Sequence, residues 1–294
     1  MERVRAYENL RGLVYTPFYL GLAEGLFAKA GVELEATLSP SGAETAAGAA
    51  AGRVDVAWGG PMRVMAAHDK DPTADLVCFG LAVARDPFLV IGPAAAPGFS
   101  PAALVGKRLL VGTHAPTPWL LLQEDVRRQG LDPARVVRED EVEPEAALTR
   151  LKAGEADYVL AFEPWGAVAA EMGLAVVSEG ARRGPLAFTS FYAPRTFVEG
   201  RRPAARALVA GLGAALDRLR AIAPDAAAAA VAPWFPNVAP RHVAAAIARY
   251  QGLGIWPETP AMTADGFVRL KSALLSGGFI ASDPPYERLV IEPV

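Results

Sequence analysis

Apolar and polar positions in this chain form short strand-like runs that alternate with longer helical repeats. The clearest strand-to-helix transition, residues 50–63, reads AAGRVDVAWGGPMR. VDVAW has the β-branched and aromatic residues of a buried strand, the glycines allow a turn, and Pro61 suits the first position of a helix. Residues 152–165, KAGEADYVLAFEPW, repeat the pattern with Asp157 in the place of Asp55. This repeat predicts two lobes of similar build.

The residues before the first transition give a β-α-β-α-β order. VRAY at 4–7 and VELEATLS at 32–39 read as strands, and residues 16–31 and 42–52 have helical spacing. This order predicts a parallel sheet with right-handed crossovers. From residue 201 onward the pattern is helical, with Pro and Gly between the segments.

Length and composition agree with a two-lobed globular protein. At 294 residues the chain is near the size at which one core divides into two, and 52% hydrophobic residues supply a large core. The 29 basic and 32 acidic residues give a net charge of −3 with no basic run, so we expect no nucleic-acid partner. A single cysteine, Cys78, excludes an internal disulfide framework.

Targeting signals leave the compartment open. The N-terminal residues MERVRAYENLRG lack the apolar segment of a secretory signal. We therefore expect a cytoplasmic protein as the sequence is written, or a periplasmic one if a signal was omitted. No window of eighteen residues is apolar throughout, so we expect no membrane span.

Candidate ligand-binding residues follow the predicted strands, because ligands of open α/β sheets bind at the carboxyl ends of strands. In the first lobe they are Glu8, Asn9, Ser39, Ser41, Gly42, Trp58, Gly59, Gly60 and Met62. In the second lobe they are Thr113, His114, Thr117, Trp119, Glu163 and Trp165. We expect the glycines to admit a ligand to the backbone and Trp58, Trp119 or Trp165 to cover an apolar face of it.

Each candidate also has a structural alternative. Glu8 and Asn9 would serve equally as solvated loop residues, and the serines as helix caps. Trp58 could be a core residue, and Glu163 could favour a helix N-terminus through the helix dipole.

Motifs for catalysis and metal binding are missing from the sequence. It has no GxSxG, HExxH or phosphate-binding GxxxxGK[ST] motif. The histidines His68, His114 and His242 lack metal-ligand spacing. We expect no metal and no cofactor.

Several sequence blocks carry a family resemblance. The run PFYLGLAEGLFAKAGVELE, the segment AGRVDVAWGG, the segment EAALTRLKAGEADYVLAFEPW and the later FTSFYAPRTFVE occur in this order within about residues 13–200. In this the chain resembles the substrate-binding proteins of nitrate, sulfonate and taurine ABC importers. That superfamily also includes the pyrimidine synthase of yeast thiamine biosynthesis and the bacterial thiamine-precursor binding proteins.

The resemblance implies an α/β, two-lobed type II periplasmic-binding-protein fold. Each lobe would be a sheet flanked by helices, and the chain would cross twice between the lobes. The first crossover falls at the polar break around Arg85 and Asp86, and the return falls near Thr189 and Phe191. We therefore predict a discontinuous first lobe of residues 1–85 plus 190–294, an inserted second lobe of residues 86–189, and hinge residues Arg85, Asp86, Thr189 and Phe191.

The resemblance also implies a function. We expect a solute-binding protein of an ABC-type importer that captures a sulfonate-like anion or a thiamine pyrimidine precursor by hinge closure, acting as a monomer with a permease as its partner. The alternative is a cytosolic enzyme of thiamine-pyrimidine biosynthesis, or of related small-molecule chemistry, on the same scaffold. The synthase has a cysteine-rich motif where this chain has FTSFY, and a lysine and a histidine where it has Gly60 and Arg63. We therefore lean towards a protein that is not an enzyme.

Overall fold

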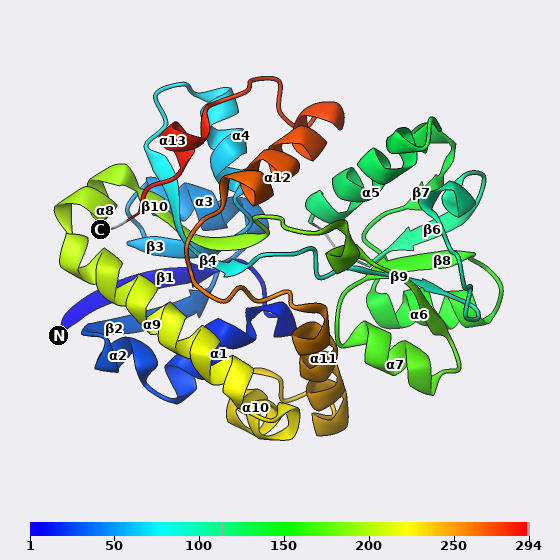
Figure 1. The fold of residues 1–294 in the computed structure, drawn as a ribbon, viewed down its shortest axis with the longest axis horizontal. Coiled ribbons are helices and arrows are strands. Elements are labelled where there is room, and N and C mark those ends of the chain that lie inside the picture. Colours follow the sequence, from blue (N-terminus) through cyan, green and yellow to red (C-terminus); the bar gives the residue numbers. More distant parts are fainter. Residues whose placement is uncertain (113–114, 293–294) are drawn as a thin grey trace.

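Two five-stranded sheets, each flanked by helices, form the two lobes of this computed structural model (Figure 1). The structure describes residues 1–112 and 115–292. The first sheet has the order β2 (Val32–Leu38), β1 (Glu2–Glu8), β3 (Val56–Gly59), β10 (Thr189–Pro194) and β4 (Leu76–Val83). The second has the order β7 (Val137–Glu139), β6 (Arg108–Val111), β8 (Tyr158–Ala161), β5 (Leu89–Gly92) and β9 (Ala175–Glu179).

Both sheets are mixed in the same way. In the first, β1 pairs in parallel with β2 and β3, and β10 is antiparallel to β3 and β4. In the second, β6 pairs in parallel with β7 and β8, and β5 is antiparallel to β8 and β9. The sequence predicted the parallel part of the first sheet. The antiparallel strand β10 follows the second lobe along the chain and returns to the first sheet.

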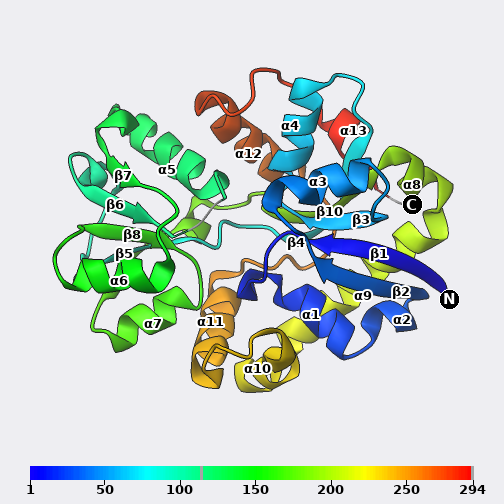
Figure 2. The ribbon, with the colours of Figure 1, turned by 180° about the vertical axis from the view of Figure 1, so that it is seen from behind.

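Helices cover both faces of each sheet. In the first half of the chain they are α1 (Thr16–Ala23), α2 (Leu26–Lys29), α3 (Gly42–Ala50), α4 (Met62–Lys70), α5 (Thr117–Arg128) and α6 (Pro144–Lys152). In the second half they are α7 (Trp165–Glu171), α8 (Arg195–Gly200), α9 (Arg202–Ala221), α10 (Pro224–Val231), α11 (Pro240–Leu253), α12 (Ala264–Ser276) and α13 (Tyr286–Leu289). In both ribbon views α11 lies between α10 of the first lobe and α7 of the second (Figure 2).

The repeated sequence pattern has the same structural meaning in both lobes. Asp55 accepts a hydrogen bond from the backbone N–H of Arg5 at 2.8 Å, and Asp157 accepts one from the backbone N–H of Arg108 at 2.8 Å. Each aspartate, just before its own strand, therefore ties that strand to its parallel neighbour. The glycines before them, Gly52 and Gly154, adopt φ values of 71° and 77°, which glycine tolerates best.

The chain passes between the lobes twice, first from β4 to β5 and then from β9 to β10. The predicted fold class, a two-lobed α/β fold with two crossovers, is thus confirmed. The division into rigid bodies at residues 85/86 and 189/190 stays a prediction, since α11 and α12 also contact elements of the second lobe.

Candidate functional site

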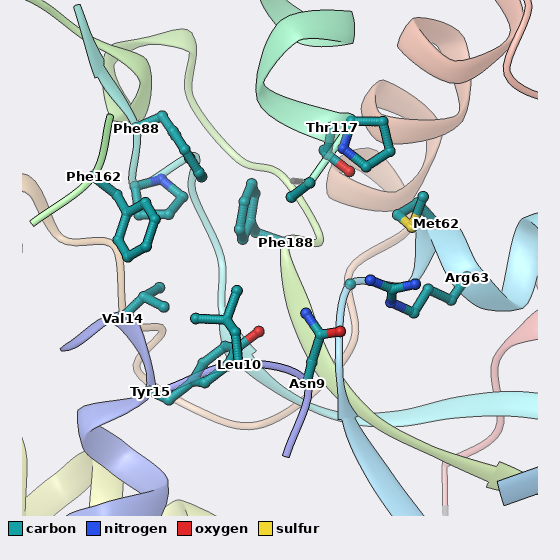
Figure 3. Close-up of a pocket in the computed structure, with 14 residues that line it drawn as sticks. Asn9, Leu10, Val14, Tyr15, Met62, Arg63, Phe88, Thr117, Phe162 and Phe188 are labelled. Carbon is teal, nitrogen blue, oxygen red and sulfur yellow. The ribbon is translucent and has the colours of Figure 1, made fainter. Parts of the chain in front are cut away.

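An apolar chamber of about 40 Å³ lies between the two lobes. Its apolar walls are Leu10, Val14, Met62, Phe88, Phe162 and Phe188 (Figure 3). The side chains of Asn9, Arg63 and Thr117 are the polar groups labelled around it, together with the phenol of Tyr15. Residues of both lobes and of both connecting segments line the chamber, so closure of the lobes would bring all of them onto one molecule.

Three phenylalanines form the wall on the second lobe's side. The ring centroids of Phe88 and Phe162 are 5.1 Å apart at an interplanar angle of 60°, and those of Phe88 and Phe188 are 6.1 Å apart at 45°. Phe88 and Phe188 belong to the two connecting segments, and Phe162 follows β8. Two of the three rings are therefore attached to the segments that connect the lobes.

Arg63 is the cation of the chamber. Among the residues that the structure describes it forms no ion pair, and its buried Nε has no hydrogen-bond partner. Its guanidinium extends towards Asn9 (Figure 3) and lies so close to the start of α3 that a Cβ on Gly42 would be 2.7 Å from its Nη2. A half-buried guanidinium with unused donors is well suited to bind an oxyanion.

Two buried phenols lie near Arg63. Burial raises the pKa of Tyr15 and of Tyr192, and the nearby Arg63 opposes this effect in both. Both phenols therefore stay neutral donors at ordinary pH. The Tyr192 hydroxyl has no hydrogen-bond partner within residues 1–112 and 115–292.

A wider, more polar outer cleft of about 530 Å³ continues from the chamber. Asn9, Leu10, Arg63, Ala115 and Phe162 line both spaces. The outer cleft adds Arg11, Ser41 and Gly42 from the first lobe, and Gly112, Glu141, Val142, Glu143 and Pro144 from the second. A ligand headgroup at Asn9 and Arg63 would thus lie at the junction of the two spaces.

The structure brings six of the sequence-predicted residues to this region. Gly60, Met62 and Thr117 line the chamber, Ser41 and Gly42 line the outer cleft, and Asn9 lines both. Ser41 also caps α3, because its Oγ accepts the N–H of Glu44 at 3.1 Å. Thr113 and His114 lie outside the described residues. Ligand contact by these residues stays a prediction.

The three candidate tryptophans line neither the chamber nor the outer cleft, and contact of any of them with a ligand stays a prediction. Trp58 is 0% exposed and stacks on Phe18 with centroids 4.3 Å apart, because alternation along β3 turns its ring towards the helices of the first lobe. Trp119 packs in the second lobe's core under the guanidinium of Arg138, 4.7 Å from the ring centroid. Trp165 packs against another core cluster of that lobe.

The predicted carboxylates and backbone positions have structural partners. Glu8 accepts a hydrogen bond from the Tyr19 hydroxyl and forms an ion pair with Arg11 at 3.1 Å. Glu163 forms an ion pair with Arg249 at 2.6 Å. Burial raises the pKa of both carboxyls against the opposing effect of these partners. The Ser39 hydroxyl donates to the carbonyl of Ser41, and Gly59 ends β3 as a buried residue. None of these four lines the chamber or the outer cleft.

Of the predicted hinge residues, Arg85 and Asp86 lie in the first connecting segment. Asp86 is buried and paired with Arg183 of the returning segment, and Arg85 donates to the carbonyl of Ala181 at 3.2 Å. Thr189 and Phe191 lie within β10 instead, and Phe191 stacks on Phe79 in the core of the first lobe. The prediction that Thr189 and Phe191 lie in a connecting segment placed them wrongly, because β10 already begins at Thr189.

The cleft residues that were not predicted from the sequence are mainly aromatic. Phe88, Phe162 and Phe188 were read as ordinary strand or crossover residues, although each directly adjoins a strand end facing the other lobe. Arg63 was noted only for its difference from the synthase. The usable signal was its position near the start of a helix that follows a glycine pair.

Chemistry outside the cleft is limited. Cys78 in β4 is 0% exposed, and burial raises the pKa of its thiol to about 12. Within the described ranges, no three His, Cys, Asp or Glu side chains gather closely enough to hold a metal ion. In the same part of the chain, no helix combines the length and hydropathy needed to traverse a bilayer.

The two lobes, the double crossover and the interlobe cleft together define a two-lobed binding-protein fold. The chain belongs to the NMT1-like family, which matches residues 13–235. A comparison with curated proteins found no match.

Solved structures share the fold over the whole chain. The aliphatic sulphonate binding protein SsuA from Escherichia coli has a TM-score of 0.77 and 18% identity, covering 100% of this chain and 93% of its own. The alkanesulfonate-binding protein SsuA from Xanthomonas axonopodis pv. citri, bound to MOPS, has a TM-score of 0.72 and 16% identity, with 99% of each chain covered. The desulfurization enzyme DSZB in complex with biphenyl-2-sulfinic acid has a TM-score of 0.70 and 15% identity, covering 99% of this chain and 97% of its own.

Proposed function

We propose that this protein is a solute-binding protein that captures a small organic anion between its lobes and delivers it to an ABC-type permease. The anion is of the sulfonate class. Its oxyanion group binds at Arg63 and Asn9, and its apolar part faces the three phenylalanines.

One observation carries the proposal. Arg63, half-buried in the interlobe cleft, has no carboxylate partner among the described residues and faces a mostly apolar chamber. A cation in such a place is costly without a counter-charge, and a bound oxyanion would supply it. The structural likeness to sulfonate-binding proteins supports the fold that this mode of capture needs.

The other ligand class, a thiamine pyrimidine precursor, fits the lining less well. An aminopyrimidine presents donors from its amino group and needs acceptors to receive them. Among the described residues that line the chamber, no carboxylate is available, and Arg63 offers only donors. The excess of hydrogen-bond donors over carboxylate acceptors in the described lining therefore favours an anionic ligand.

Among the described residues of the cleft, the groups that the enzymatic alternative would need are not favourably placed. Cys78 is buried within the first sheet and does not line the cleft. The polar side chains in the described lining of the chamber are the amide of Asn9, the hydroxyls of Thr117 and Tyr15 and the guanidinium of Arg63. Burial keeps the Tyr15 phenol protonated, so it is a poor base.

The test is binding of sulfonates by calorimetry, together with native mass spectrometry of the purified protein for a co-purified anion. Arg63→Gln should weaken binding at least about 30-fold, because a charge-assisted contact is lost. Arg206→Gln is the matched control, since Arg206 is exposed on α9 and lines neither the chamber nor the outer cleft. Equal binding by wild type and Arg63→Gln, at equal melting temperature, would refute the proposed site.

A further inference from the structure

Most of the polar side chains labelled around the chamber lie on one side of it, and the Tyr15 phenol, beside Leu10, is the exception. Asn9, Arg63 and Thr117 lie towards one side, and Val14, Phe88 and Phe162 lie towards the other (Figure 3). Phe188 and Leu10 stand between the two sides. An anion held at Arg63 would therefore point the rest of its structure at hydrocarbon.

The size of the chamber limits that remainder. Its volume of about 40 Å³ has room for about three water-sized groups, since one such group needs roughly 10–15 Å³. A methylene or methyl group is close in size to a water molecule. The chamber thus has room for a short tail, and a hexyl chain would have to extend into the outer cleft.

The described lining places no acid where it could receive a positive charge on the tail. Among the described residues that line the chamber there is no Asp or Glu. Glu8, the buried carboxylate at the end of β1, is engaged by Tyr19 and Arg11. Glu141 and Glu143 line only the outer cleft, beyond the headgroup position.

From these features we infer that the chamber selects monoanions with a short uncharged tail and rejects zwitterions of the same size. This inference rests on the proposed function and specifies its ligand class. Leu10, Val14 and the three phenylalanines determine the selectivity, because an ammonium group among them would lose its hydration and gain no acceptor.

Two ligands of nearly equal shape test the inference. 1-Propanesulfonate and taurine have the same number of non-hydrogen atoms, with a methyl group in one where the other has an ammonium group. Calorimetry on the wild-type protein should show 1-propanesulfonate binding at least about 30-fold more tightly than taurine. 1-Hexanesulfonate should bind at least about tenfold more weakly than 1-propanesulfonate, because its chain exceeds the chamber.

Two variants that differ by a single charge test the preference for 1-propanesulfonate over taurine. Leu10 is half-buried and projects into the chamber, so a polar residue there keeps contact with solvent through the outer cleft. Leu10→Asp should reduce the preference for 1-propanesulfonate over taurine at least about tenfold. Leu10→Asn, which has the same shape without the charge, should leave the preference within about twofold of wild type.

The outcomes separate this inference from the proposed function. Taurine binding as tightly as 1-propanesulfonate, with both lost in Arg63→Gln, would overturn the selectivity and leave anion capture standing. If Glu143→Gln then weakened taurine alone, the tail would point outward into the outer cleft. Binding of none of the three sulfonates by protein of normal melting temperature would overturn the proposed function and the selectivity together.

Discussion

Arg249 of α11 donates to the carboxylate of Glu163 in the second lobe at 2.6 Å, and this carboxylate is 0% exposed. The next residue on α11, Tyr250, accepts the backbone N–H of Glu163 at 2.9 Å. The C-terminal helical region is thereby joined to the second lobe through a buried charge. A second pair, Arg241 with Glu171 at 2.7 Å, lies at the surface of the same helix.

Removing the cation of the buried pair should be costly. In Arg249→Ala the Glu163 carboxylate would be left buried without its main counter-charge, and we expect the free energy of unfolding to fall by about 3 kcal/mol. Arg241→Ala is the matched control, because an exposed pair contributes about 0–1 kcal/mol. Urea denaturation at pH 7 measures both, and equal losses in the two variants would contradict this interpretation.

The strand and helix order of both lobes was readable from the sequence because it depends on local signals. Asp55 and Asp157 precede matching strands, and each makes the same contact to a neighbouring strand's N–H. The family resemblance supplied the double crossover. The position of β10 between β3 and β4 depends on contacts more than 100 residues apart in sequence, which no local pattern encodes.

The site was predictable only in part. Loop residues after strands, such as Asn9, Gly60 and Thr117, were found because the carboxyl ends of strands face the other lobe. The orientation of Trp58 was not predictable, since a four-residue strand buried on both faces has no alternation to show which side its ring takes. Phe188 was missed because its position in the cleft is set by the path of the returning segment, a tertiary feature.

The core and chamber aromatics should respond differently to truncation. Trp58→Ala removes a fully buried ring stacked on Phe18, and we expect a loss of about 3–5 kcal/mol in the free energy of unfolding. Phe162→Ala removes a half-buried ring that lines the chamber, so we expect a smaller loss of stability and a sulfonate affinity about tenfold weaker. Thermal denaturation and calorimetry on both variants give the comparison. A stability loss in Phe162→Ala as large as that in Trp58→Ala would show that Phe162 is a core residue.

Asp86 should make the protein less stable as the pH rises through the weakly acidic range. Burial raises the pKa of Asp86 from 3.8 to about 6, although Arg183 opposes the shift. The folded state then binds this proton more tightly than the unfolded state, so its contribution to stability is present below pH 3.8 and is lost as the pH rises to about 6. Relative to Asp86→Asn, the wild-type free energy of unfolding should fall by about 1–3 kcal/mol between pH 4 and pH 7.

The control for that titration is an aspartate shifted in the other direction. Hydrogen bonds from Ser282 lower the pKa of the half-buried Asp69. Its contribution is present above the pKa of the unfolded state and is lost as the pH falls, so Asp69→Asn should change the pH profile with the opposite sign. Parallel profiles for wild type and Asp86→Asn would contradict the raised pKa of Asp86.

A substitution at the start of the neighbouring helix α3 should shift the Arg63 guanidinium while Arg63 itself is kept. A Cβ at Gly42 would lie 2.7 Å from the Nη2 atom of Arg63, which is the far end of a flexible side chain and can move at little cost. Gly42→Ala should therefore leave the melting temperature unchanged or raise it slightly, since alanine favours the helix, and should weaken sulfonate binding about three- to tenfold.

Ser41→Ala is the complementary variant. It removes the cap of α3 and should cost about 1 kcal/mol of stability while leaving Arg63 in place. Calorimetry with 1-propanesulfonate and thermal denaturation of both variants separate the two effects, and wild-type affinity in Gly42→Ala would mean that the guanidinium does not hold the ligand from its observed position.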